Sequence, residues 1–138
     1  MFIDASVIVA ILGREAGYEE IEKRLADMEG PFFISPLVKF EAASALARQK
    51  SGEHKPSAKL LRQAWKAVTA FQEDIAAEEV AISPAIGQLA LEASATYGKA
   101  IGHAADLNFG DCFAYACAKA LKVSLFYKGS DFAHTDLA

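Results

Sequence analysis

Apolar residues along this chain form four short runs separated by longer amphipathic stretches. The runs lie at residues 1–3, 32–34, 80–82 and 124–127 and are rich in Phe, Ile, Val and Leu. Short runs of this kind are typical of buried strands. Strands that alternate with helices form a parallel sheet through right-handed crossovers. We therefore expect one domain, residues 1–138, with a three-layer α/β/α architecture around a short, mostly parallel central sheet.

The stretches between these runs carry apolar residues at helical spacing. Helices are expected over residues 6–12, 18–28, 36–50, 57–75, 84–97 and 108–121. Ser35-Pro36 and Ser83-Pro84 each place an N-cap before a proline at the first helical position. One face of the 57–75 helix is apolar and predicts either core or a dimer surface; it comprises Leu61, Trp65, Val68, Phe71 and Ile75.

Composition narrows the class of protein. The chain is 53% hydrophobic and 23% charged, which excludes disorder, and no apolar run approaches the roughly 20 residues that span a bilayer. A strand at residue 2 leaves no room for a signal peptide, so we expect a cytoplasmic protein that does not bind membranes. Cys112 and Cys117 point in different directions from one helix and are expected in the core. The three histidines are dispersed, without the spacing of metal ligands.

The net charge of −4 does not exclude a nucleic-acid partner. The chain has 18 acidic and 14 basic residues, so four acids assigned to a metal site would leave a neutral remainder. Charge alone therefore decides nothing about the partner.

Four acids occupy positions from which they can meet. Asp4 ends the first run and Asp131 follows the fourth, and the carboxyl ends of parallel strands border the ligand crevice of an open sheet. Asp111 lies at a helix start, and Glu41 lies among alanines that suggest close packing of its helix on the sheet. Hard divalent cations take oxygen ligands from carboxylates that converge from separate elements.

Each acid also has an ordinary structural explanation. Asp4 or Ser6 can N-cap the following helix, and Asp111 can form a capping box with Asn108. Asp131 can belong to a turn, and Glu41 can be a solvated helix residue. Several acids that all fall at strand exits, or on the helices just beyond them, are harder to explain as independent caps.

The chain resembles PIN-domain ribonucleases of the VapC toxin type over its whole length. The residues that carry this resemblance are Asp4-Ala5-Ser6, Glu41 in its alanine-rich helix, the block from Asn108 to Ala116, Lys128 to Phe132, and Thr135-Asp136. The resemblance implies a Mg²⁺- or Mn²⁺-dependent endoribonuclease that cleaves RNA to a 5′-phosphate and a 3′-hydroxyl. It further implies a homodimer that a cognate VapB-type antitoxin holds inactive.

The same resemblance assigns roles to residues. Asp4, Glu41 and Asp111 are the expected metal ligands, and Asp131 is the expected fourth catalytic acid. Ser130 departs from the family, which often carries Asp or Asn there, so the fourth position stays open between Asp131, Ser130 and Asp136. We rank Asp131 above Asp136, which is expected to be structural.

Three further residues are predicted to contact the substrate. Ser6 can hydrogen-bond a ligand water or a phosphate, Arg48 follows Glu41 by seven residues on one helical face, and Lys128 lies at the fourth strand's tip. Two alternative functions remain at this point. One is a catalytically weak PIN-like domain that binds RNA or protein. The other is an aspartyl-phosphate phosphatase, although that family places a second Asp where this chain has Ser6.

Overall fold

A computed structural model describes the whole chain, residues 1–138. It contains four two-residue strands, six α-helices and two 3₁₀ helices. In chain order these are β1 (Phe2–Ile3), α1 (Ala5–Leu12), α2 (Tyr18–Asp27), β2 (Phe33–Ile34), α3 (Pro36–Ser51), α4 (Ala58–Asp74), β3 (Glu78–Glu79), α5 (Pro84–Tyr97), η1 (Lys99–Ile101), α6 (Phe109–Leu121), β4 (Leu125–Phe126) and η2 (Asp131–His134).

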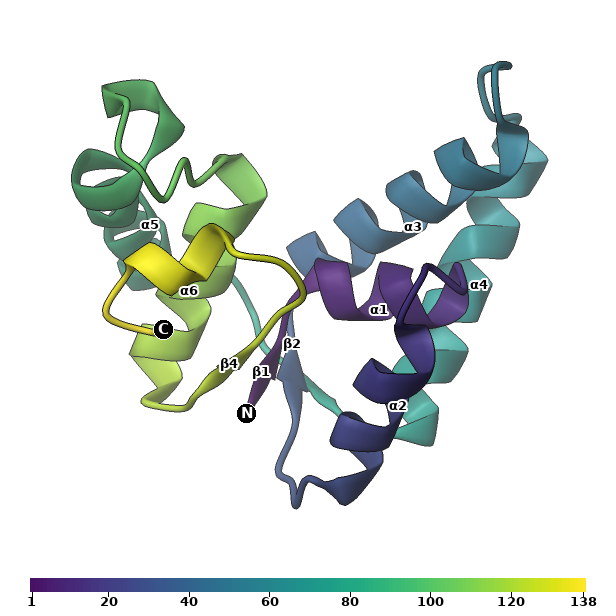
Figure 1. Ribbon diagram of the computed structural model, residues 1–138, viewed down its shortest axis with the longest axis horizontal. Helices are drawn as coiled ribbons and strands as arrows, with labels where there is room; N and C mark the ends of the chain where they lie inside the picture. The colour runs from purple at the N-terminus through teal and green to yellow at the C-terminus, as the bar shows by residue number, and fades with distance from the viewer.

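The strands form one parallel sheet in the order β3-β2-β1-β4. Phe2 of β1 is in register with Phe33 of β2 on one side and with Leu125 of β4 on the other. Helices α5 and α6 cover one face of the sheet, and α1 to α4 cover the other (Figure 1). The predicted three-layer α/β/α architecture with a parallel sheet is confirmed.

Short-range capping explains where several helices begin. The hydroxyls of Ser35, Ser57 and Ser83 each accept the backbone N–H of the residue three positions later, at 3.1 to 3.2 Å. Each bond satisfies one of the N–H groups that a helix start leaves without an intrahelical partner. Proline follows Ser35 and Ser83 at the first helical position, as predicted.

The predicted third strand at residues 80–82 is wrong, because β3 comprises Glu78–Glu79. Backbone bonds from Glu78 N to Phe32 O (2.9 Å) and from Val80 N to Ile34 O (2.8 Å) set its register on β2. β3 is an edge strand and both of its glutamates are exposed. Pairing with β2, and not hydrophobicity, therefore determines which residues form this strand.

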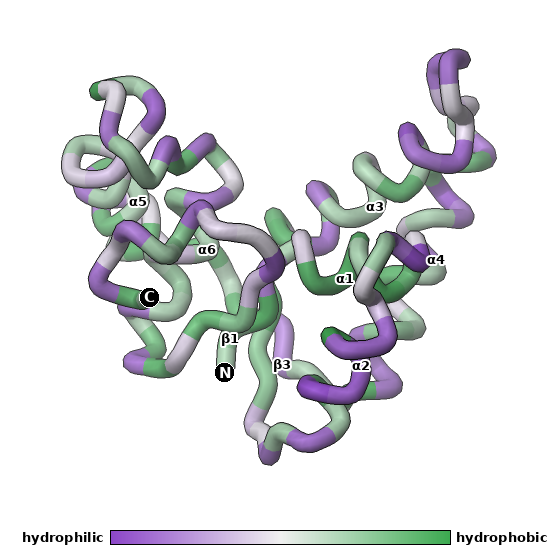
Figure 2. The backbone as a smooth tube through the Cα atoms, in the orientation of Figure 1, coloured by the Kyte–Doolittle hydropathy of each residue, from purple (hydrophilic) through white to green (hydrophobic).

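The hydrophobic core surrounds β1 and extends under the helices. Phe2, Ile3, Ile8 and Ile34 are completely buried, and Figure 2 shows β1 hydrophobic while the connection between α3 and α4 is hydrophilic. Cys112 and Cys117 are both buried core residues.

The apolar face predicted for residues 61–75 divides in two. On α4, Val68 and Phe71 are buried, whereas Leu61 and Trp65 are exposed. The exposed part, together with Phe40 of α3, forms an apolar groove between α3 and α4. None of the helices combines the length and the hydropathy that crossing a bilayer requires.

Candidate acidic site

Asp4 follows β1 directly, at the carboxyl edge of the sheet. Its backbone N–H donates to Phe126 O of β4 at 3.0 Å, so pairing of the two strands holds its position. Asp4 is also the N-cap of α1, and its Oδ2 accepts the Ser6 N–H at 3.0 Å and the Ser6 hydroxyl at 2.5 Å. The expected capping role and the position at the strand tip therefore coexist in one residue.

The other carboxylate oxygen of Asp4 has no partner. Asp4 is only 4% exposed, and its Oδ1 is buried without a hydrogen bond. Burial raises the pKa of Asp4, and the two hydrogen bonds from Ser6 oppose that rise. Buried polar atoms without partners are uncommon in folded proteins, so this oxygen is a candidate ligand atom.

Ser6 is engaged on both sides within the protein. Its hydroxyl donates to Asp4 Oδ2 and accepts the Lys128 N–H at 2.9 Å, which ties the β4 exit to the start of α1. The predicted contact of Ser6 with a substrate would compete with these two bonds. The arrangement favours a role in holding Asp4.

Asp111 caps a helix and is also one of the candidate metal-binding acids. It is the third residue of α6, where its Oδ2 accepts the Asn108 N–H at 3.0 Å and its own N–H donates to Asn108 Oδ1 at 2.9 Å. The capping box is therefore present. Burial raises the pKa of Asp111 to about 6; the Asn108 N–H opposes the rise, and the charges of Asp4 and Asp131 add to it.

Glu41 brings a third carboxyl from the opposite layer. It lies on α3, is half-buried, and its carboxylate packs against the backbone of α6 at Gly110. Burial, followed by the charges of Asp4 and Asp111, raises the pKa of Glu41 to about 7, while Arg48 lowers it. Glu41 is therefore an inward-facing residue and not a solvated one.

The two candidates for the fourth acid have different surroundings. Asp131 is exposed at the start of η2, and its charge raises the pKa of both Asp4 and Asp111. Asp136 accepts the Tyr115 hydroxyl and the Lys119 ammonium, each at 2.7 Å. These bonds lower the pKa of Asp136, with Lys119 the larger cause. Asp136 therefore has structural partners, whereas the charge of Asp131 acts on Asp4 and Asp111.

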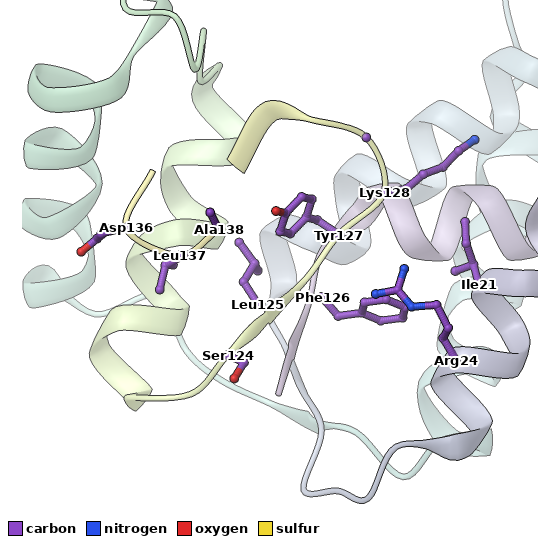
Figure 3. A pocket seen from close by; sticks show the side chains of 11 residues that line it. Ile21, Arg24, Ser124, Leu125, Phe126, Tyr127, Lys128, Asp136, Leu137 and Ala138 are labelled. Carbon is purple, nitrogen blue, oxygen red and sulfur yellow. The ribbon is translucent and has the colours of Figure 1, made fainter. Parts of the chain in front are cut away.

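The two predicted basic contacts are also placed differently. Arg48 is exposed on α3, close enough to Glu41 for its charge to act on that carboxyl. The Lys128 ammonium forms an ion pair with Glu15. In Figure 3, Lys128 and Asp136 point to opposite sides of β4, along a cavity of about 660 Å³ at the edge of the sheet. Lys128 can reach a substrate only if it leaves Glu15.

Carboxylate oxygens are the ligands that a hard divalent cation prefers, but these carboxylates do not surround a common metal position. As the side chains lie, no three His, Cys, Asp or Glu residues are close enough to hold a single metal ion. The donor set is nevertheless all carboxylate oxygen, one oxygen of Asp4 is orphaned, and each of the three carboxyls has a raised pKa. These features fit Mg²⁺ or Mn²⁺, whose charge offsets carboxylate repulsion.

Sequence reasoning missed two residues of this region. Glu15, the partner of Lys128, gave no signal because the contact spans 113 positions of the chain. Gly110, beneath Glu41, had a signal: a glycine within a helix destabilises it relative to alanine unless space or backbone conformation requires it.

Comparison with known proteins shows the family to which this chain belongs. The PIN domain family model matches residues 1–137. A VapC ribonuclease of Rhizobium meliloti (strain 1021) is 50% identical over 139 residues, covering 99% of this chain and 98% of the relative. Ribonuclease VapC30 of Mycobacterium tuberculosis is 31% identical over 138 residues, covering 100% and 96%.

Solved structures share the fold at low sequence identity. Mycobacterium tuberculosis VapC20, described as a toxin that cleaves the sarcin-ricin loop, superimposes with a TM-score of 0.71 at 16% identity, covering 99% of this chain and 97% of that one. A toxin-antitoxin complex from Klebsiella pneumoniae gives a TM-score of 0.66 at 14% identity, covering 98% and 92%.

Proposed function

Because this chain belongs to the PIN domain family, we propose that it is a VapC-type toxin that hydrolyses phosphodiester bonds within RNA. The relative at 50% identity is named a VapC ribonuclease and matches the chain almost from end to end. The aspartyl-phosphate phosphatase considered above belongs to a different family and is not retained. Expected products are a 5′-phosphate and a 3′-hydroxyl, and the expected place of action is the cytoplasm.

The observation that supports this proposal is that Asp4, Glu41 and Asp111, from three separate elements, are buried or half-buried carboxyls with raised pKa values. Burial raises the pKa of Glu41 and of Asp111, the charges of Asp4 and Asp111 add to the rise at Glu41, and the charge of Asp4 adds to the rise at Asp111. Repulsion of this kind destabilises a fold unless a ligand offsets it. We therefore propose that these three carboxylates bind Mg²⁺ or Mn²⁺ and that Asp131 is the fourth acid.

The chain's own residues supply binding and orientation. Asp4 offers its unpaired Oδ1 while Ser6 holds Oδ2, and Asp111 is oriented by its capping box. A bound divalent ion lowers the pKa of water and offsets the charge that develops on the phosphate. Arg48, whose charge acts on Glu41, and Lys128, once Glu15 releases it, are the proposed contacts to the RNA backbone.

The proposed partners are a cognate VapB-type antitoxin and a second copy of the chain. Large apolar residues remain exposed on two surfaces: Phe40, Leu61 and Trp65 on α3 and α4, and Leu91, Ile101 and Phe109 on α5, η1 and α6. Exposed apolar patches commonly mark protein interfaces. We assign the α5/η1/α6 surface to the homodimer.

Cleavage of a mixed RNA pool tests the function directly. The wild-type chain should cut RNA with Mg²⁺ or Mn²⁺ and stop when EDTA is added, and Asp4→Asn should not cut under either condition. Millimolar Mn²⁺ should raise the Tm of the wild-type chain and leave that of Asp4→Asn unchanged. A wild-type chain that binds RNA without cutting it would instead support the catalytically weak, RNA-binding alternative.

A further inference from the structure

Gly110 occupies a position where glycine is unfavourable for the helix itself. It is the second residue of α6, it is buried, and its φ lies outside the left-handed region that glycine alone adopts readily. Alanine would stabilise a helix at such a position, since glycine loses more backbone freedom on folding. The backbone conformation therefore does not explain why residue 110 is glycine. The remaining explanation is the lack of space for a side chain at this position.

The space above Gly110 is filled by the carboxylate of Glu41. A Cβ on residue 110 would lie 2.7 Å from Glu41 Cδ and 2.8 Å from Oε1, and closer still to Oε2. Real Cβ atoms essentially never approach other atoms this closely. Gly87, inside helix α5, provides a contrast, because a Cβ there would meet nothing within 4 Å.

We propose that Gly110 is a positioning residue that, by lacking a side chain, lets the Glu41 carboxylate lie against the first turn of α6. The two residues come from opposite layers, with α3 and α6 on either side of the sheet (Figure 1). The contact therefore sets how closely the Glu41 carboxylate approaches α6, which carries Asp111. The consequence for catalysis rests on the proposed function, whereas the contact itself does not.

A methyl group at residue 110 would displace the side chain of Glu41 before it displaced the helices. Ala42 and Ala43, next to Glu41, are buried in the core and hold the α3 backbone in place. The carboxylate is the far end of a flexible side chain and can rotate away at small energetic cost. Gly110→Ala should therefore fold, with Glu41 turned away from Asp111.

Thermal stability without metal tests the contact independently of activity. In EDTA, Gly110→Ala should raise the Tm in a Glu41→Ala background, where the space is empty and alanine favours the helix. In the wild-type background Gly110→Ala should lower the Tm, or raise it by less than it does in the Glu41→Ala background. Gly87→Ala is the control and should shift the Tm equally in both backgrounds. Equal shifts for Gly110→Ala in both backgrounds would overturn the proposal.

Cleavage assays test the consequence for the site. Gly110→Ala should lower kcat at least tenfold at saturating Mn²⁺ and change KM little, while Gly87→Ala should match the wild type. Glu41→Asp shortens the side chain by one methylene and makes room for the Cβ, so adding Gly110→Ala to it should cause no further loss. If Gly110→Ala lowers kcat by the same factor in the wild-type and Glu41→Asp backgrounds, Gly110 does not act by positioning Glu41. If no variant cleaves RNA, the proposed function fails, and the Tm comparison alone decides the role of Gly110.

Discussion

The Ser6 hydroxyl donates to Asp4 Oδ2 at 2.5 Å and is the only side-chain partner of that buried carboxylate. Ser6→Ala should therefore reduce the free energy of unfolding by about 1 to 3 kcal/mol, because a buried carboxyl oxygen loses a hydrogen-bond donor. Urea denaturation measures this change. Ser51→Ala, which removes an exposed hydroxyl bonded to Arg48 O, is the control and should change stability by less than about 0.5 kcal/mol. Equal effects of the two substitutions would mean that Ser6 does not hold Asp4.

Asp111→Asn separates the capping role of this residue from its charge. Asparagine keeps an oxygen that can accept the Asn108 N–H, so stability should be unchanged or improved as repulsion from Asp4 is relieved, while cleavage is lost. Asp111→Ala removes the acceptor and should cost about 0.5 to 2 kcal/mol. Chemical denaturation and the RNA assay measure both effects. If Asp111→Asn still cut RNA, the residue would be a cap and nothing more.

Stability without metal should depend on pH with a defined sign. The pKa of Glu41 rises from 4.5 to about 7 and that of Asp111 from 3.8 to about 6, so the folded state binds more protons than the unfolded chain across this window. The free energy of unfolding should therefore fall from about pH 4 to pH 7 and then level off. Glu41 has the higher of the two raised pKa values, so it should contribute most of the fall near neutral pH. Denaturation in EDTA at several pH values tests this, and Glu41→Gln should flatten the profile.

The fourth acid can be identified by comparing Asp131→Asn with Asp136→Asn. Asp131→Asn should lower both Mn²⁺ affinity and cleavage, because its charge acts on Asp4 and Asp111. Asp136→Asn should leave both intact and cost at most about 1 kcal/mol, since its pair with Lys119 is largely exposed. The opposite pattern would reverse this ranking. Tighter Mn²⁺ binding by Ser130→Asp would show that residue 130 faces the ion.

The chain should form a homodimer through the surface of α5, η1 and α6. Leu91 and Phe109 on this surface are 68% and 71% exposed, and covering them would remove apolar area from water. Light scattering should give a mass close to twice 14.8 kDa for the wild type and a monomer for Leu91→Glu. Glu92→Lys, which changes an exposed charge next to Leu91, is the control and should remain dimeric. A monomeric wild type at high concentration would exclude the dimer.

Local sequence was sufficient to predict a structural feature wherever the contact that forms it spans only a few residues. The sequence predicts the caps at Ser35 and Ser83 because each joins a side chain to a backbone N–H three positions away. The same holds for the pairing of Asn108 with Asp111. The alternation of apolar runs and amphipathic stretches was likewise enough for the three-layer parallel fold, because strand and helix periods are local properties of the chain.

Tertiary structure decided everything that depends on contacts between distant segments. Ser6 meets Lys128 across 122 positions, and Glu41 meets Gly110 across two layers of the fold. The third strand was misplaced because its register depends on hydrogen bonds with β2, and no periodicity within residues 78–82 encodes them. Sequence thus determined that Asp4 lies at a strand exit, Asp111 at a helix start and Glu41 within the helix that follows the second strand. Only packing of the layers determined how they face one another, because side-chain direction and burial arise from the folded whole.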